Sequence, residues 1–163
     1  MSIAICPGSF DPITLGHLNI IRRTAQIFDK VVVLIMLNSS KTTPMFSIDE
    51  RVEMVRKAVE RFPNVEVDTS EGLLAEYAKK YDGAVIVKGL RAASDFEYEF
   101  QMNLINKKIN PELETMFLTA NEKYTFLSSS VVREMARYGA DLNGFVPCEI
   151  IEEVERKAQS WRH

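Results

Sequence analysis

Residues 2–18 read SIAICPGSFDPITLGHL and join two kinds of sequence pattern. The first five residues form a short apolar run, which predicts a buried strand. After the loop, apolar side chains recur at helical spacing and fall on one face of a predicted helix: Leu18, Ile21, Ala25 and Phe28. A strand, a loop and a helix in this order form the first unit of an alternating α/β fold.

The same alternation continues along the chain. Further apolar runs lack polar alternation, which suits parallel strands covered on both faces, and they predict strands at residues 31–37, 65–67, 84–88 and 115–119. Helical patterns lie between or after them, at residues 47–61, 71–81, 94–109, 129–138 and 149–161. The alternation predicts an α/β fold with a Rossmann-like, doubly wound, five-stranded parallel sheet and C-terminal helices, in a single domain over residues 1–163.

Local signals mark the ends of several predicted helices. Ser47 and Glu50 form a capping box, after which Val52, Val55 and Val59 fall on an inner helical face. Gly139 suits the position after a helix C-terminus. Pro147 is well placed to start the terminal helix.

Composition and charge narrow the class of protein. The chain has 163 residues, 46% hydrophobic content and a net charge of −3, so no overall basic field favours nucleic acid or an anionic membrane surface. Its longest apolar run, at residues 31–37, is far too short to span a membrane. Cys6 and Cys148 are isolated and the first residues show no export signal. We therefore expect reduced thiols and a cytoplasmic location, with a disulfide as the alternative.

The loop at residues 6–18 carries more functional groups than a turn needs. Gly8 lets the backbone approach a ligand closely, and Ser9 supplies a hydroxyl. Gly16 and His17 come at the start of the first helix, where free N–H groups and the helix dipole favour an anion. The alternative is an ordinary Gly/Pro turn followed by a helix-end histidine.

Two further loops carry cations after predicted strands. Lys41 lies in the polar segment 39–46, and the alternative for such a lysine is a solvated surface position. Lys88, Gly89 and Arg91 follow the fourth strand and place two cations around a small residue, which suits phosphate.

Acidic and hydroxyl groups follow on the next two helices. Glu99 is placed to reach back toward a ribose or base, whereas Asp95 and Glu97 are typical of solvated acids at a helix start. Three consecutive serines, 128–130, precede an amphipathic helix, although one is enough for an N-cap. Arg133, one turn later, faces either the same anion or solvent.

These four loops follow different strands of one parallel sheet, so they meet at the carboxyl edge where such sheets bind ligands. Their glycines, hydroxyls and cations predict a polyphosphate site. The sequence has no P-loop GxxxxGK[ST] and no GxGxxG, which disfavours kinase-type NTPases and dinucleotide dehydrogenases. It also has no HExxH and no GxSxG, so neither a built-in zinc site nor Ser-His-Asp hydrolysis is expected.

Five segments together resemble a known family: PGSFDPITLGH, SSKTTPMFSIDERV, VKGLRAASDFEYEFQM, NPELETMFL and YTFLSSSVVRE. They are similar to the bacterial phosphopantetheine adenylyltransferases, nucleotidyltransferases with a T/HxGH motif and a closing ISSSxxR-like motif. The similarity runs nearly end to end and weakens only toward the C-terminus. Thr14 favours this family over the glycerol-phosphate cytidylyltransferases and nicotinate-mononucleotide adenylyltransferases, which typically have histidine at that position.

The resemblance implies a fold of the nucleotidyltransferase type and an activity in coenzyme A biosynthesis. AMP would pass from ATP, with Mg²⁺, to 4′-phosphopantetheine by direct in-line attack, giving dephospho-coenzyme A and pyrophosphate. It also implies a homohexamer that is inhibited by coenzyme A. The alternatives are an adenylyl- or cytidylyltransferase with another phosphorylated acceptor, and a nucleotide sensor without catalysis.

The resemblance also implies roles for individual residues. The implied catalytic residues are Ser9, His17, Lys41 and Arg91, with His17 on the α-phosphate. The implied acceptor contacts are Ser9, Lys41, Leu74 and Lys88. The implied ATP contacts are Ser9, Phe10, His17, Gly89, Leu90, Arg91, Glu99, Tyr124, Thr125, Phe126, Leu127, Ser128, Ser129 and Ser130. Two positions depart from the common pattern of the family, because Ser9 replaces a threonine and Lys88 replaces an arginine.

Overall fold

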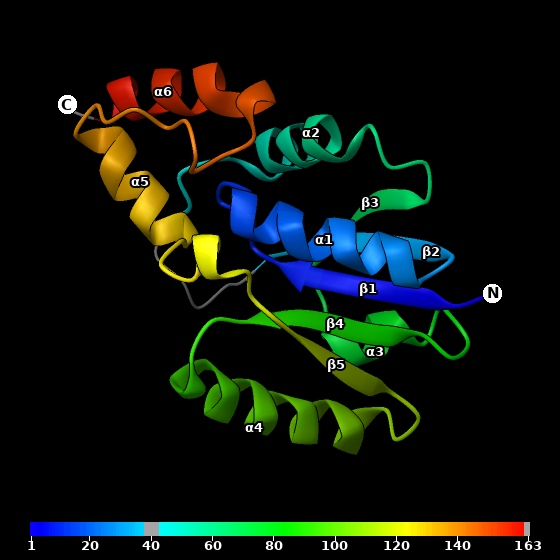
Figure 1. The fold of residues 1–163 in the computed structure, drawn as a ribbon. Coiled ribbons are helices and arrows are strands. Elements are labelled where there is room, and N and C mark those ends of the chain that lie inside the picture. The colour runs from blue at the N-terminus through cyan, green and yellow to red at the C-terminus, as the bar shows by residue number, and fades with distance from the viewer. Residues whose placement is uncertain (38–42, 162–163) are drawn as a thin grey trace.

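The fold is built on one sheet of five parallel strands. A computed structural model describes residues 1–37 and 43–161. The strands are β1 (Ile3–Gly8), β2 (Lys30–Met36), β3 (Val65–Ser70), β4 (Val85–Leu90) and β5 (Glu114–Thr119). They lie in the order β3-β2-β1-β4-β5, which confirms the predicted Rossmann-like, doubly wound sheet (Figure 1).

Helices cover both faces of this sheet. The helices α1 (Leu15–Ile27) and α2 (Ile48–Val59) lie on one face, while α3 (Leu74–Ala78) and α4 (Ala93–Ile109) lie on the other (Figure 1). After β5 come a short 3₁₀ turn, η1 (Glu122–Tyr124), and α5 (Ser129–Arg137). The chain ends with η2 (Cys148–Ile150) and α6 (Ile151–Ser160), which pack beside α5 and α2.

Side chains that alternate along the central strands form two hydrophobic cores. Ala4, Val31 and Val33 point to the core under α1, α2, α5 and α6. Ile5 and Val32 point the other way, toward α3 and the C-terminal end of α4. This alternation within continuous apolar runs is what a sheet covered on both faces requires.

The strand order reverses between β1 and β4, and there the sheet opens. The pairing of β1 with β4 covers only Ala4–Val85 and Ile5–Ile86, although both strands continue for several residues. The pairing of β1 with β2, by contrast, runs through to Gly8. In open α/β sheets ligands bind at such a reversal point. The separation of the two strands therefore creates the space in which the predicted loops meet.

The structure corrects several predicted boundaries. The first strand runs on through Pro7 and Gly8, after its pairing with β4 has ended. The third strand extends to Ser70, and the predicted helix 71–81 is only the five residues of α3. The terminal helix starts after Pro147 as a 3₁₀ turn and becomes α-helical at Ile151.

Edge strands differ from the predicted covered strands. In β3 and β5, half-buried and exposed positions alternate, whereas β2 is buried along nearly its whole length. An edge strand has a neighbour on one side only, and here the helices leave part of its faces open. The prediction that all five strands are covered on both faces holds for the centre of the sheet alone.

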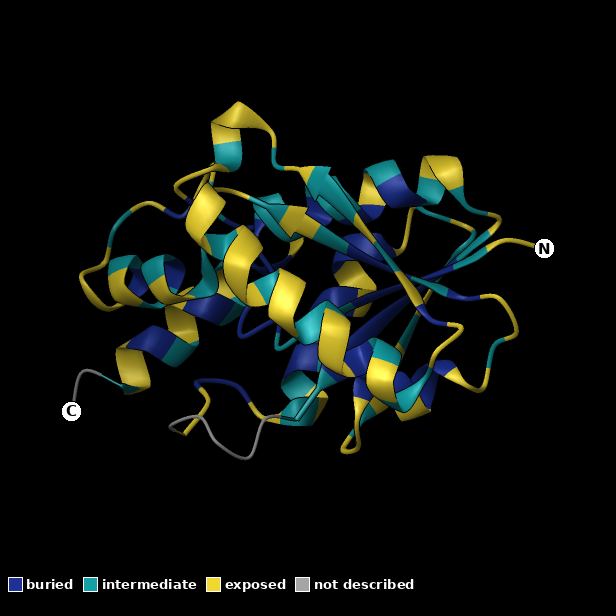
Figure 2. Cartoon of the chain, turned by 90° about the horizontal axis from the view of Figure 1, so that it is seen from below, coloured by how far each residue is buried: buried dark blue, intermediate teal, exposed yellow. Residues whose placement is uncertain are grey.

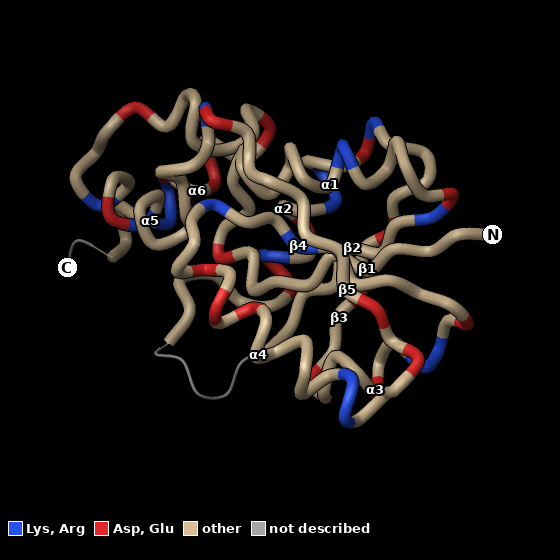
Figure 3. The backbone as a smooth tube through the Cα atoms, turned by 60° about the horizontal axis from the view of Figure 1, so that its bottom comes forward, with Lys and Arg blue, Asp and Glu red and all other residues tan. Residues whose placement is uncertain are grey.

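Charge is mixed over the molecule. Acidic and basic residues are interspersed along the elements in Figure 3, consistent with the net charge of −3. Across residues 1–37 and 43–161, no helix is long and apolar enough to cross a membrane.

Candidate active site

A cavity of about 620 Å³ opens where β1 and β4 separate. The carboxyl ends of both strands, the first turns of α1 and α4, and the N-terminus of α5 surround it. Three of the four loops singled out in the sequence contribute to it. The predicted site residues that line it are Ser9, Phe10, His17, Lys88, Gly89, Arg91, Glu99, Tyr124, Leu127, Ser128 and Ser129.

The capping of α1 holds the imidazole of His17. Thr14 is the N-cap, and its Oγ1 accepts a hydrogen bond from the His17 backbone N–H at 3.2 Å. The Thr14 backbone N–H in turn donates to His17 Nδ1 at 3.0 Å. Since Nδ1 is an acceptor, the neutral ring carries its proton on Nε2. Thr14 therefore caps the helix and orients the histidine.

His17 is uncharged at neutral pH. Burial, followed by the positive charge of Arg91, lowers the pKa of His17 to about 4. The ring of Phe10 packs edge-on against the imidazole, with centroids 5.1 Å apart. The cavity thus holds a neutral N–H donor at a helix N-terminus, where an anionic group is favoured.

Phe10 adopts a backbone conformation that is rare for a residue with a side chain. Its φ of 49° lies in the left-handed region, which non-glycine residues seldom occupy outside functional sites. A Cβ on Gly8 would lie 3.0 Å from the Phe10 ring. Gly8 therefore makes room for this ring, a packing reason that differs from the expected close approach to a ligand.

Packing also requires a second glycine of the site, Gly89, but not a third, Gly16. A Cβ on Gly89 would lie 2.8 Å from Cγ1 of Ile20, so the glycine lets α1 pack closely on β4. A Cβ on Gly16 would lie 3.6 Å from Cβ of Tyr124, an ordinary contact distance. Of the two, only Gly89 is required by the helix packing.

Arg91 joins the end of β4 to the loop before α5. Its Nη1 donates to the Leu127 carbonyl at 2.9 Å, and its Nε lies 3.5 Å from Asp95 Oδ2. The Asp95 carboxylate also accepts from the Arg91 backbone N–H at 3.2 Å. Asp95 is therefore more than the solvated helix-start acid that the sequence suggested, because it fixes the backbone and the side chain of a cavity residue.

Lys88 and Glu99 form an ion pair, with Nζ and Oε2 2.5 Å apart. The resemblance implied an acceptor contact for Lys88 and an ATP contact for Glu99. Both side chains line the first cavity and are about four-fifths buried. The two predicted substrate contacts thus meet in one charge pair.

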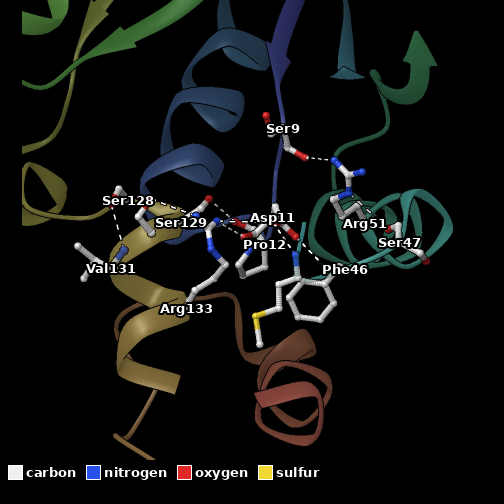
Figure 4. Close-up of polar contacts among 12 residues, drawn as sticks. Ser9, Asp11, Pro12, Phe46, Ser47, Arg51, Ser128, Ser129, Val131 and Arg133 are labelled. Atoms are coloured by element: carbon white, nitrogen blue, oxygen red, sulfur yellow. Dashed lines mark hydrogen bonds and ion pairs between the residues drawn. The ribbon is translucent and has the colours of Figure 1, made fainter. Parts of the chain in front are cut away.

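All three serines at the start of α5, the N-cap Ser128 and the helix residues Ser129 and Ser130, have partners. Ser128 is the N-cap and accepts from the Val131 backbone N–H at 3.2 Å. Ser129 Oγ donates to the Pro12 carbonyl at 2.7 Å, and Ser130 Oγ accepts from Arg133. The two serines beyond the cap therefore fasten α5 to the loop after β1 and to its own second turn (Figure 4).

A second cavity, of about 1220 Å³, adjoins the first. Both are lined by Ser9, Phe10, His17 and Ser129. The second extends between the loop after β1, the segment before α2, and the helices α5 and α6. Its other lining residues include Leu37 and Thr43, which flank the part of the chain that the structure does not describe.

Some predicted site residues lie elsewhere. Lys41 falls outside the described residues. Leu74, the first residue of α3, is buried in the core on that face of the sheet and lines neither cavity. Ser130 lines only the second cavity, and three further residues line neither of the two: Leu90, Thr125 and Phe126.

Sequence reasoning missed two buried charged residues beside the site. Asp11 and Arg51 are only 7% and 4% exposed, and both line the second cavity. Arg51 offered a signal, because it precedes Val55 by one helical turn and so falls on the predicted apolar face of α2. Asp11 offered none, since Asp-Pro is also a common turn sequence.

Neither cysteine forms a disulfide in the structure. Cys6 and Cys148 are both free, so the disulfide alternative is wrong. Burial raises the pKa of Cys6 to about 12, and the thiol stays protonated although it lines the first cavity. Within residues 1–37 and 43–161, no group of three His, Cys, Asp or Glu side chains could hold a metal ion.

Known proteins are similar to this chain over nearly its whole length. Residues 5–135 match the family described as cytidylyltransferase-like. Phosphopantetheine adenylyltransferase from Caldanaerobacter subterraneus subsp. tengcongensis is 54% identical over 96% of this chain and 98% of its own. The enzymes of the same name from Dictyoglomus turgidum and Clostridium tetani are 53% and 51% identical, over 94% and 98% of this chain and 96% and 99% of their own.

Solved structures share the fold at much lower identity. A protein from Vibrio parahaemolyticus, assigned as a nicotinate-nucleotide adenylyltransferase, superposes with a TM-score of 0.69 at 20% identity and covers 96% of each chain. A bifunctional NMN adenylyltransferase/ADP ribose pyrophosphatase from Francisella tularensis, complexed with AMP and a manganese ion, gives a TM-score of 0.70 at 15% identity. That match covers 98% of this chain and 51% of the bifunctional protein.

Proposed function

The chain belongs to the cytidylyltransferase-like family, as a phosphopantetheine adenylyltransferase, and from this premise we propose that it transfers AMP from ATP to 4′-phosphopantetheine. The products are dephospho-coenzyme A and pyrophosphate, and the reaction is a step of coenzyme A biosynthesis. An oxygen of the acceptor phosphate forms a bond to the α-phosphorus of ATP, and the bond from that phosphorus to the pyrophosphate breaks. No covalent intermediate with the protein is involved.

The meeting of two cavities at Ser9, Phe10, His17 and Ser129 is the observation that carries this proposal. A direct transfer between two substrates requires that both reach one reacting centre from different sides. ATP binds in the first cavity, which most of the implied ATP contacts line. The acceptor extends into the second cavity, beside the chain segment that carries Lys41, and its phosphate lies at the shared residues.

Catalysis in this arrangement rests on positioning and charge stabilisation. The acceptor phosphate is ionised at neutral pH, so it hardly needs a general base. The Nε2–H of His17 donates to the α-phosphate, where negative charge develops, and a neutral imidazole can do so without exchanging a proton. Arg91 and Lys41 contribute positive charge, and the Ser9 hydroxyl lies between donor and acceptor.

Mg²⁺ enters with ATP in this proposal. The described residues offer no three-ligand site, which fits an ion held largely by substrate phosphates and water, as Mg²⁺ usually is in nucleotide-binding enzymes. When bound, the ion neutralises charge on the phosphates.

Pyrophosphate release with ATP and 4′-phosphopantetheine tests the proposal directly. We expect turnover with this acceptor, and a fall in kcat of roughly 10²–10³-fold for His17→Ala, as for the loss of one transition-state donor. His163→Ala, at the only other histidine of the chain, is the matched control and should retain full activity. Near-normal turnover of His17→Ala would contradict the role of the imidazole.

A panel of acceptors and nucleotides separates the alternatives. Release only with a different phosphorylated acceptor, or with CTP, would show another nucleotidyltransferase. Nucleotide binding without pyrophosphate release from any pair would show a sensor.

An apolar outer face on α4 supports assembly of several copies. Phe96, Phe100, Leu104 and Ile105 are 44–54% exposed, and the rings of Phe96 and Phe100 stack with centroids 5.7 Å apart. Figure 2, which views the molecule from the α4 side, shows this helix as largely exposed. Apolar side chains gathered on one helix mark an interface in many proteins. The proposed assembly is a homohexamer.

Coenzyme A is the proposed feedback inhibitor. It contains the pantetheine and adenylate parts of the product, so it would compete for the same two cavities. Inhibition that is relieved by raising the substrate concentrations would support this, and inhibition that persists at saturating substrates would contradict it.

A further inference from the structure

The carboxylate of Asp11 holds the chain segment that forms one wall of the second cavity. Its Oδ2 accepts from the Met45 backbone N–H at 3.0 Å, and its Oδ1 accepts from the Phe46 N–H at 2.9 Å (Figure 4). The two donors are consecutive and belong to no helix or strand. Thr43 and Pro44, the residues immediately before them, line the cavity. Asp11 itself is 7% exposed, so water does not replace these bonds easily.

A second tie joins the same two segments, and the loop after β1 again supplies the acceptor. Arg51, on the first turn of α2, donates from Nη1 to the Ser9 carbonyl at 3.1 Å and from Nε to the Ser47 carbonyl at 3.4 Å. The loop after β1 thus receives hydrogen bonds from Arg51 and provides the acceptors for Met45 and Phe46. Because the acceptors are two different residues of the loop, Ser9 and Asp11, the ties fix both the distance and the register of the two segments.

The other side of Asp11 faces α5. Arg133 donates from Nη1 to the Asp11 backbone carbonyl at 2.7 Å, while the distance from Nη1 to the carboxylate is 3.6 Å. The shorter contact is to the backbone, which is unchanged by substitution of the side chain. Ser129 also holds this loop through the Pro12 carbonyl. The carboxylate is therefore needed mainly for residues 45 and 46, and α5 keeps its own attachments.

We propose that Asp11 is a positioning residue for acceptor binding. Its carboxylate fixes residues 43–46 as a wall of the second cavity, so that an acceptor in that cavity meets Ser9 and His17. This inference rests on the proposed function, in which the second cavity takes the acceptor. It assigns the first cavity no dependence on the Asp11 side chain, since Asp11 does not line it.

The variant Asp11→Asn tests the inference with little change of volume. An amide offers one acceptor where two N–H groups converge, and its NH₂ group faces the second donor. We expect KM for 4′-phosphopantetheine to rise about tenfold or more, while KM for ATP changes less than about threefold. Equal changes in both constants, or no change in the acceptor constant, would overturn the inference.

A matched control is available in Asp141→Asn. Asp141 also accepts a backbone N–H, that of Asn143 at 3.0 Å, but it lies outside both cavities. Neither Michaelis constant should change in this variant. The variant Arg51→Met gives a contrasting pattern, because Ser9 lines both cavities, and both constants should rise.

Amide hydrogen exchange of the unmodified protein keeps the inference testable if Asp11→Asn does not fold. Saturating 4′-phosphopantetheine alone should slow exchange at Met45 and Phe46, and saturating ATP alone should not. Equal exchange with and without the acceptor would overturn the inference. Absence of pyrophosphate release by the unmodified enzyme would instead contradict the proposed function, so the two failures are distinguishable.

Discussion

At the scale of single residues, the neutral state of His17 is the property most open to measurement. The pKa of this imidazole is lowered to about 4 by burial and by Arg91. NMR should therefore show a neutral ring protonated on Nε2 throughout pH 6–8, with no titration in that range. His163→Gln removes the only other imidazole signal. A His17 titration midpoint above pH 6 would contradict the structure.

The lowered pKa also has a consequence for stability. Between about pH 6.5 and pH 4 the unfolded chain binds a proton at His17 that the folded chain does not. The free energy of unfolding should therefore fall as pH drops through this window, and it should be insensitive to this group above it. Urea unfolding at several pH values, compared with His17→Gln, isolates the effect. A pH dependence that is identical in the two proteins would exclude His17 as its source.

The Lys88–Glu99 pair makes a prediction about substrate affinity. The Glu99 carboxylate is paired with the Lys88 ammonium, and the resemblance to the family implies that this ammonium contacts the acceptor. In Glu99→Gln we expect a lower KM for the acceptor, by roughly threefold, because the competing charge is gone. Glu97→Gln, at an exposed position on the same helix, is the control. A raised acceptor KM in Glu99→Gln would show that the pair organises Lys88 for binding.

The residue types in the sequence predicted the kind of chemistry at the site, but they did not predict which side chains pair with one another. Glycines, serines and cations after parallel strands were sufficient to predict where His17, Arg91 and the serines gather. The sequence left open whether the Arg133 side chain faces an anion or solvent. In the structure it donates to the Asp11 carbonyl, more than a hundred positions away in the sequence, which no local pattern could predict. The pairing of Lys88 with Glu99 is likewise set by the packing of α4 on β4, which no local pattern encodes.

At the scale of elements, the N-terminus of α1 joins a helix cap to the histidine proposed to act in catalysis. Thr14 is 1% exposed, and its hydroxyl satisfies the His17 backbone N–H. We expect Thr14→Ala to lower the free energy of unfolding by about 1 kcal/mol and to reduce kcat, since the helix start that orients the imidazole loosens. Thr14→Ser keeps the hydroxyl and should retain most of both. Loss of stability without loss of kcat would separate the cap from the catalytic geometry.

Strong local patterns predicted most of the elements. The capping box at Ser47 and Glu50 is present, and Gly139 follows the C-terminus of α5 with a φ of 72°. Where local patterns were weak, the predicted ends of the helix were wrong. The helix α3 is much shorter than the predicted 71–81, and no side-chain cap supports its start. The strand through Pro7 and Gly8 is set by the ladder to β2, a long-range effect that local propensity does not contain.

At the scale of the whole molecule, the α4 face makes a prediction about assembly. We expect Phe100→Glu or Leu104→Glu to convert the oligomer to smaller species in analytical ultracentrifugation, because a buried charge without a partner opposes association. Ile27→Glu, at an exposed apolar residue on α1, is the control and should leave the assembly intact. If the unmodified protein is monomeric at micromolar concentration, the proposed hexamer is contradicted.

The divergence of β1 from β4 after Ile5 and Ile86 has a further consequence for how this chain could change. The space of the first cavity comes from the path of the backbone. Cys6 and Val87, directly after the divergence, still belong to the core, whereas Ser9, Lys88 and Arg91 line the cavity and lie outside the core. New specificities should be reachable by exchanging such cavity-lining residues while the core residues and the sheet remain intact. A chimera with a relative's loops should unfold cooperatively at nearly the original temperature.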